Sequence, residues 1–219
     1  MTVAEWYKHF QIPTHLQRHM LRVAAVGEHI AKDWTKPIDE NSVVTTLLLH
    51  DLGNLLKFGL EKGVSLFDVS QRNMKKWSEI QQQLRTKYSP DEHTTTQMMA
   101  REIGVSQRVL FLLNNMGSSH LHKTLETDDW ELKICSYADF RVAPDGFVTV
   151  TERFEDIMQR YKGRAHPLAD TQKTLEKRES CLRLEQQLQE FCAVDLQKLP
   201  ADIVEHNTQA LRAWDPLQE

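Results

Sequence analysis

Apolar side chains recur along most of the chain at the three- and four-residue spacing that is typical of amphipathic helices. The pattern predicts helices over residues 14–30, 41–51, 68–87, 89–104, 108–115, 129–142, 151–161, 168–193 and 200–213. Strand character is confined to a short run at residues 147–150. The pattern therefore predicts an all-α fold, a helical bundle with extra helices after its core.

Capping residues and glycines support several of these boundaries. We expect capping boxes that start at Thr14 and at Ser89, because a glutamine or glutamate follows each three residues later. Ser106 is placed to cap the helix at 108–115, and Thr151 to open the one at 151–161. Gly53 follows the second helix where a left-handed residue often ends helices.

Composition agrees with the helical prediction and limits the number of domains. Eight glycines and seven prolines make about 7% of the 219 residues, whereas average usage of the two together is roughly 12%. A chain so poor in turn-forming residues is neither an all-β sandwich nor a disordered linker. We expect a main domain at residues 1–165 and a helical appendage at 166–219, packed on the same domain.

The net charge of −4 lies in the C-terminal part, because residues 170–219 carry ten acidic and six basic side chains. A net charge this small gives no indication of a strongly basic surface for nucleic acid or membrane lipid. Within this acidic part, apolar residues recur among Glu and Gln and suit either packing on the core or the seam of a homodimer. They are Leu182, Leu184, Leu188 and Phe191.

Cysteine usage and hydropathy point to a cytoplasmic protein. Cys135, Cys181 and Cys192 form no CxxC pair, so neither a disulfide framework nor a thiolate zinc site is expected. The N-terminus has no basic patch that leads into an apolar stretch. The longest apolar runs, such as residues 109–113, are far shorter than the ~18 residues that span a bilayer.

Histidines and aspartates on the predicted helices provide the candidate chemistry. His50 and Asp51 end the second predicted helix, His19 faces inward at the edge of an apolar stripe, and Asp139 interrupts another such stripe. A buried carboxylate needs a cation or several hydrogen-bond donors. One divalent metal would satisfy all four side chains. Imidazole with carboxylate suits manganese, iron, zinc, cobalt or nickel, whereas magnesium prefers oxygen ligands alone.

Three segments that contain these residues, 19–24, 47–53 and 137–139, resemble the motifs of the HD-domain superfamily of metal-dependent phosphohydrolases. The resemblance covers residues 14–145 and implies an all-α helical core. It also implies a set of metal ligands, which would be His19, His50, Asp51 and Asp139.

The resemblance leaves open whether one or two ions are bound. Many dinuclear members carry two further histidines between the His-Asp pair and the last aspartate, and this chain offers His93 and His120 there. The segment from His93 is also similar to a helix of bacterial HD enzymes that cleave diadenosine tetraphosphate. Asp51 would then bridge two ions. His122 is a rival for His120, and the alternative for both positions is an ordinary polar residue.

Basic residues near these motifs are candidates for contact with substrate. Arg22 follows His19 by three residues, Arg141 follows Asp139 by two, and Lys57 lies beyond the His-Asp pair. Their alternatives are ion pairs with core acids for the two arginines and a solvated side chain for Lys57. Asn54 stands where many phosphodiesterase members have lysine and deoxynucleotidase-like members have glutamate. The sequence therefore assigns the chain to neither subclass.

The resemblance implies hydrolysis of a phosphoester or phosphoanhydride by a metal-activated water, on a nucleotide or another small phosphorylated metabolite. Two divalent ions and two aspartates would leave a net charge of +2, which favours phosphate. A first alternative is a mixed-valent di-iron oxygenase that cleaves a C–C or C–P bond with a similar ligand set. A second is a non-catalytic signalling module, which the complete motif disfavours.

Overall fold

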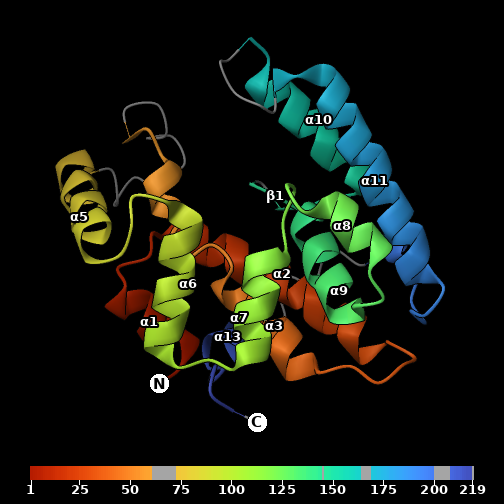
Figure 1. Ribbon diagram of the computed structural model, residues 1–219, viewed down its shortest axis with the longest axis horizontal. Helices are drawn as coiled ribbons and strands as arrows, with labels where there is room; N and C mark the ends of the chain where they lie inside the picture. Colours follow the sequence, from red (N-terminus) through yellow and green to blue (C-terminus); the bar gives the residue numbers. More distant parts are fainter. Residues whose placement is uncertain (61–72, 145, 164–168, 200–207, 219) are drawn as a thin grey trace.

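The structure is a computed structural model that describes residues 1–60, 73–144, 146–163, 169–199 and 208–218. Helices dominate these residues, and one two-stranded hairpin accompanies them (Figure 1), so the all-α prediction is confirmed. The α-helices are α1 (Val3–His9), α2 (Thr14–Lys32), α3 (Glu40–Leu49), α5 (Met74–Lys87), α6 (Glu92–Ile103), α7 (Gln107–Asn115), α8 (Leu121–Glu126), α9 (Trp130–Phe140), α10 (Val150–Tyr161), α11 (Thr171–Gln189) and α13 (Thr208–Arg212).

Short elements complete the described chain. Two 3₁₀ turns, η1 (Asn54–Lys57) and η5 (Leu196–Lys198), follow α3 and α11. Strands β1 (Val142–Ala143) and β2 (Gly146–Phe147) pair antiparallel between α9 and α10. The strand-like run predicted at residues 147–150 thus contributes only its first residue, because Val150 already belongs to α10. Among the described helices, none is both long and apolar enough to cross a membrane.

Helix starts follow short polar side chains, although not always those expected. The Ser106 side chain accepts a hydrogen bond from the backbone of Val109, as predicted. Helix α6 begins after Asp91 rather than Ser89, because Asp91 accepts from the backbone of Thr94. Helix α10 begins at Val150 rather than Thr151, and Thr149 and Glu152 form a capping box at its start.

The predicted capping box at the start of α2 does not form. Pro13 is the N-cap residue and makes no side-chain hydrogen bond, and Gln17 instead donates from Nε2 to the carbonyl of Ile12. Helix α1, which the hydrophobic pattern did not predict, precedes this turn, and its buried residues Val3 and Tyr7 join the core. The predicted helix starts at residues 68, 168 and 200 lie outside the described residues.

Helices α2 and α3 pack directly against each other at the centre of the core, and α9 packs against both. Gly27 of α2 faces Leu47 of α3 so closely that a Cβ would lie 2.1 Å from Leu47 Cδ1. This close approach is possible only because glycine has no side chain. The helices that carry the histidines and aspartates of the motif are thereby held together.

The C-terminal helices pack on this core. Helix α11 lies alongside α10 at one edge of the molecule (Figure 1) and also contacts α8 and α9, whereas α13 packs on α1 and α2. Leu184 and Leu188 of α11 are fully buried, so these members of the predicted stripe pack inside this chain. The backbone amide of Val3 donates to the carbonyl of Trp214, which ties the two ends of the described chain together.

Candidate metal centre

Four side chains from three helices converge at one point. His19 comes from α2, His50 and Asp51 follow directly on α3, and Asp139 lies in the last turn of α9. His19 Nε2 lies 3.2 Å from Asp139 Oδ1 and 3.6 Å from Asp51 Oδ2. His50 Nε2 lies 3.6 Å and 3.7 Å from the same two oxygens. One ligand atom each from His19, His50 and Asp139 fall within 4.8 Å of one another, which is compact enough to hold one ion.

The turn after His50 is positioned by a close contact with α6. Gly53 donates its backbone N–H to Thr96 Oγ1 at 2.9 Å, and a Cβ on Gly53 would lie 2.1 Å from the carbonyl oxygen of Glu92. Its φ of −83° is not left-handed, so the predicted C-terminal role of Gly53 is wrong. The glycine is needed instead because the backbone of α6 passes so close. This contact brings the start of α6 beside the His-Asp turn.

The ring of His50 is held in the orientation that a metal ligand needs. Its Nδ1–H donates to the carbonyl of Leu47 at 2.7 Å, so Nε2 is the nitrogen that points at the carboxylates. Nε2 is buried and has no hydrogen-bond partner among the described residues. A metal-binding histidine characteristically donates its other ring N–H in this way, which fixes its tautomer.

Electrostatics at this point favour a cation. Burial acts to lower the pKa of His50, but the carboxylates of Asp51 and Asp139 outweigh it and raise the pKa from 6.5 to about 9. Burial acts to raise the pKa of Asp139, but the two histidines beside its carboxylate, His19 and His50, hold it well below its ordinary value. The metal-free centre therefore retains a proton on His50, and a divalent ion would take that proton's place.

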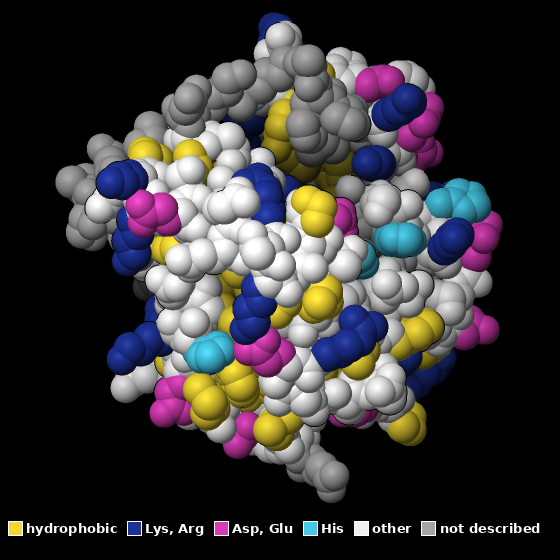
Figure 2. Space-filling view, turned by 60° about the vertical axis from the view of Figure 1, so that its left-hand side comes forward, with side chains coloured by type: hydrophobic (Ala, Val, Ile, Leu, Met, Phe, Trp, Pro, Cys, Tyr) yellow, Lys and Arg dark blue, Asp and Glu magenta, His cyan; other side chains and the backbone are white. Residues whose placement is uncertain are grey.

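The four side chains open into a cavity of about 550 Å³. In the space-filling view, histidine side chains gather beside an acidic one on the face that is hollowed above them (Figure 2). Besides the four convergent residues, polar and apolar side chains line the cavity. Among these lining residues are Asn54, Lys57, His93, His120, Arg153, Phe154, Ile157 and Lys177.

A model of the HD domain matches residues 16–139, which is more than half of the 219-residue chain. The chain belongs to the HD-domain family. Comparisons with curated proteins and with solved structures found no match to it. HD domains bind divalent metals, and most members of the family are metal-dependent hydrolases. The matched residues include His19, His50, Asp51 and Asp139, so the convergent group coincides with the His, His-Asp and Asp positions of the HD motif.

The two further histidines of this HD domain also reach the cavity. His93 lies in the first turn of α6, and His120 is the N-cap residue of α8. Neither joins the compact group that His19, His50 and Asp139 form among the described residues, so a second ion stays a prediction. The rival His122 points away: its side chain is 84% exposed, lies 3.6 Å from Glu126, and is not part of the cavity lining.

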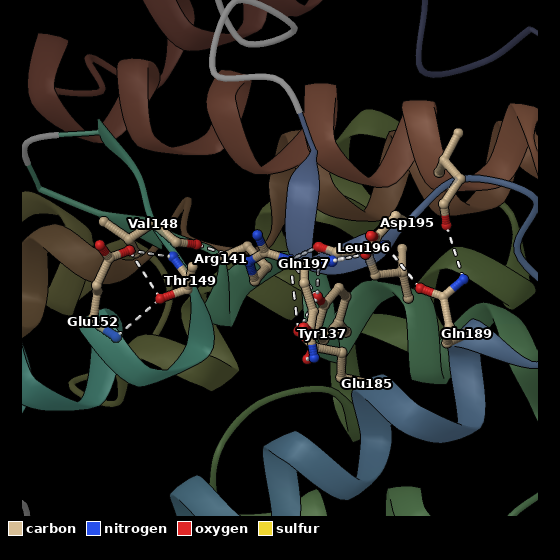
Figure 3. A network of polar contacts seen from close by, with 11 residues as sticks. Tyr137, Arg141, Val148, Thr149, Glu152, Glu185, Gln189, Asp195, Leu196 and Gln197 are labelled. Atoms are coloured by element: carbon tan, nitrogen blue, oxygen red, sulfur yellow. Dashed lines mark hydrogen bonds and ion pairs between the residues drawn. The ribbon is translucent and has the colours of Figure 1, made fainter.

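Arg141, predicted to contact substrate, lies in the core instead. Side chains two positions apart on a helix point in directions that differ by about 200°. Arg141, two residues after Asp139, therefore points away from the cavity that Asp139 faces. The Arg141 side chain is 0% exposed and donates to Val148, Tyr137 and Leu196 (Figure 3). Its guanidinium also lies 3.7 Å from the carboxylate of Glu185 on α11. The alternative of a core ion pair is the one the structure supports.

The other two basic candidates lie in different places. Arg22 donates from Nη1 to the carbonyl of Pro144 at 3.2 Å and does not line the cavity. Its position therefore does not support contact with substrate. Lys57 does line the cavity, but its Nζ lies 3.2 Å from the carboxylate of Glu92, so part of its charge is already balanced. Asn54, at the position that varies between subclasses, lines the cavity as well.

Two cations on the cavity wall were missed by sequence reasoning. Arg153 lies on α10 and Lys177 on α11, and both lie beyond the residues that the family model matches. No motif marks either position, and each of the two helices carries at least one other basic residue. Only the docking of α10 and α11 brings them to the metal centre.

Proposed function

We propose that this HD domain binds a divalent transition metal through His19, His50, Asp51 and Asp139 and hydrolyses a phosphoester or phosphoanhydride. The substrate would be a nucleotide or another small phosphorylated metabolite. The observation that carries the proposal is the buried Nε2 of His50, which has no hydrogen-bond partner among the described residues and faces two carboxylates. A buried polar atom without a partner is unfavourable, and a bound ligand that contacts the atom removes this cost.

The donor set fits a divalent ion of the first transition series. Two imidazole nitrogens and two carboxylates suit iron, manganese, cobalt, nickel or zinc better than magnesium. The chemistry supplied by a bound divalent ion is activation of water for attack on phosphorus and stabilisation of charge on the phosphoryl oxygens. His93 and His120 on the same cavity wall support a second ion, with Asp51 as the bridging ligand.

The cavity supports a small substrate. Its volume of about 550 Å³ lies within the range of roughly 300–1,000 Å³ for small-molecule sites. Phe154 and Ile157 provide an apolar wall, and Lys57, Arg153 and Lys177 bring positive charge to the same space. A compound with an organic portion and one or more phosphates matches both features.

The test combines metal analysis with a substrate panel. Chelator-treated protein is reloaded separately with manganese, iron, cobalt, nickel or zinc, and phosphate release is measured from nucleoside mono-, di- and triphosphates and from sugar phosphates. We expect release with at least one ion, and its loss in His50→Ala and Asp139→Asn. His122→Ala serves as the matched control, because its side chain is exposed outside the cavity.

Two results would contradict the proposal. Phosphate release that persists in His50→Ala after chelation would show that the reaction does not use this centre. A strict requirement for dioxygen with iron, without phosphate release under anaerobic conditions, would point to the oxygenase chemistry of some HD proteins instead. Release of phosphate without oxygen supports hydrolysis.

A further inference from the structure

Arg153 is a partly buried cation with unused hydrogen-bonding capacity. Its side chain is only 16% exposed, it lines the cavity, and its Nε is buried without a hydrogen-bond partner among the described residues. Among the described residues, its one ion pair is a contact of 3.3 Å from Nη1 to Asp156. The Asp156 carboxylate is already bound more closely by Arg160, at 2.6 Å from Nη2 and 2.8 Å from Nε. A buried donor that is left unpaired in this way is costly, and an anion in the cavity would satisfy it.

Arg153 also lies within electrostatic reach of the metal centre. Burial lowers the pKa of Arg153, and the carboxylate of Asp139 acts against burial to raise it. A guanidinium stays charged under these conditions, because its ordinary pKa lies above about 12. The cavity thus holds a permanent positive charge close to, but separate from, the four convergent side chains.

Lys177 adds a second cation from the neighbouring helix. It is half-buried, it lines the same cavity from α11, and no carboxylate of the described residues lies within 4.0 Å of it. Lys57 is different, because it lies 3.2 Å from Glu92. Helices α10 and α11 pack side by side (Figure 1), so Arg153 and Lys177 bring positive charge to the cavity from two neighbouring helices.

We propose that Arg153 and Lys177 form an anion-binding subsite that takes a second phosphate group of the substrate while the metal centre takes the reacting one. The inference rests on the proposed function and narrows the substrate class to compounds with adjoining phosphates, such as nucleoside di- or triphosphates. Arginine suits this role because its planar fork binds two phosphate oxygens, and lysine adds a point charge. A monophosphate would leave both cations unused.

The test measures binding rather than turnover. Metal-loaded protein is titrated calorimetrically with methylenediphosphonate, a non-hydrolysable diphosphate, and with inorganic phosphate, and the metal content is measured after each titration. We expect the Arg153→Gln/Lys177→Gln double variant to bind methylenediphosphonate about 10–100-fold more weakly. Its affinity for inorganic phosphate should change less than about threefold, because that ligand uses the metal centre alone.

Matched variants separate the subsite from general effects of charge and folding. Lys173→Gln removes the same charge from the same helix, but Lys173 is 73% exposed, does not line the cavity, and pairs with Asp170. It should bind both ligands as the unmodified protein does. Lys177→Gln alone changes a half-buried side chain and should lose part of the diphosphonate affinity with an unchanged melting temperature. Arg153→Lys, which keeps the charge but not the fork, should recover only part of it.

Two results overturn the subsite: equal loss of both ligands in the double variant, or no loss of either. Equal loss would mean that the two cations contact the reacting phosphate itself. The proposed function fails by a different result, namely that the unmodified protein retains no metal after reloading. In that case chelated protein is titrated with methylenediphosphonate alone, and the subsite is tested by weaker binding in the double variant than in Lys173→Gln.

Discussion

At the scale of single residues, the two ring nitrogens of His50 have separate tasks. Nδ1 donates to the Leu47 carbonyl within its own helix, and Nε2 faces Asp51 and Asp139 from other parts of the site. Asp139 meets the histidines of two different helices in turn. The His50 ring is therefore oriented by a local hydrogen bond, and its Nε2 faces a carboxylate from a helix far away in the sequence.

Replacing His50 with alanine should remove most of the bound metal. The variant loses a ligand nitrogen and leaves two carboxylates facing each other with one histidine, so we expect metal affinity to fall at least about tenfold. Metal content after dialysis, measured by mass spectrometry, checks this result. His122→Ala should keep its full metal content, and equal loss in both variants would show that exposed histidines bind the metal.

At the scale of elements, the centre depends on how closely helices approach one another. The backbone of α6 passes against Gly53 in the turn after α3, and Glu102 near the other end of α6 binds α1 and α5. Glu102 contacts His9 at 3.2 Å, Lys87 at 2.9 Å and the Tyr88 hydroxyl at 2.7 Å. Helix α6 is thus fixed at both ends. The contact with Gly53 sets the distance between the His-Asp turn and His93.

Gly53→Ala should destabilise the protein and disturb the metal centre, because the new Cβ would meet the Glu92 carbonyl oxygen, which is backbone and does not rotate away. We expect a loss of about 1–3 kcal/mol in the free energy of unfolding, with weaker metal binding. Urea unfolding with and without metal measures both effects. Gly59→Ala is the control, because nothing lies within 4 Å of its added Cβ. Equal stability of the two variants would contradict the close approach.

Glu102 should make stability depend on pH in acid. Burial acts to raise the pKa of Glu102, but Tyr88, Lys87 and His9 outweigh it and lower the pKa from 4.5 to about 2. The carboxylate therefore stabilises the fold fully above pH 4.5, and this stabilisation is lost as the pH falls towards 2. Glu102→Gln should cost about 1 kcal/mol at pH 7, and the difference should vanish near pH 2. Urea unfolding at several pH values would expose a constant difference, which would contradict this assignment.

At the scale of the whole molecule, the cavity is closed by helices that lie beyond the HD-matched residues. Helix α11 is tied to α9 by a buried network in which Glu185 accepts from the Tyr137 hydroxyl at 2.6 Å and lies beside Arg141 (Figure 3). Arg141 lies two residues after Asp139 and is the first residue after the end of α9. The same network thus anchors α11, which carries Lys177, and the end of the helix that carries Asp139.

Glu185→Ala should be strongly destabilising, because it leaves the guanidinium of Arg141 buried without its carboxylate. Breaking one side of a buried pair costs about 3–5 kcal/mol, and thermal unfolding of the full chain measures it. Glu179→Ala on the exposed face of the same helix should cost less than about 0.5 kcal/mol. If Glu185→Ala unfolds like Glu179→Ala, the network does not hold α11 in place.

The sequence by itself determined the helical class, most helix positions and the four residues of the HD motif. Periodicity and capping are local properties, and the directions of His19 and Asp139 follow from the stripes of their own helices. The prediction for Arg141 was wrong because it used distance in sequence and not the direction of the side chain around the helix. Arg141 is near Asp139 in sequence, but its side chain points into the core.

Only the tertiary structure decided what surrounds the metal centre. The contact of Gly53 with α6, and the arrival of Arg153 and Lys177 at the cavity, depend on how helices far apart in sequence dock. The apolar faces of α10 and α11 indicate that these helices pack against other elements, but a hydrophobic stripe does not indicate which elements these are. The candidate metal ligands could therefore be predicted from local pattern, whereas the charges that line the cavity could not, because long-range packing places them there.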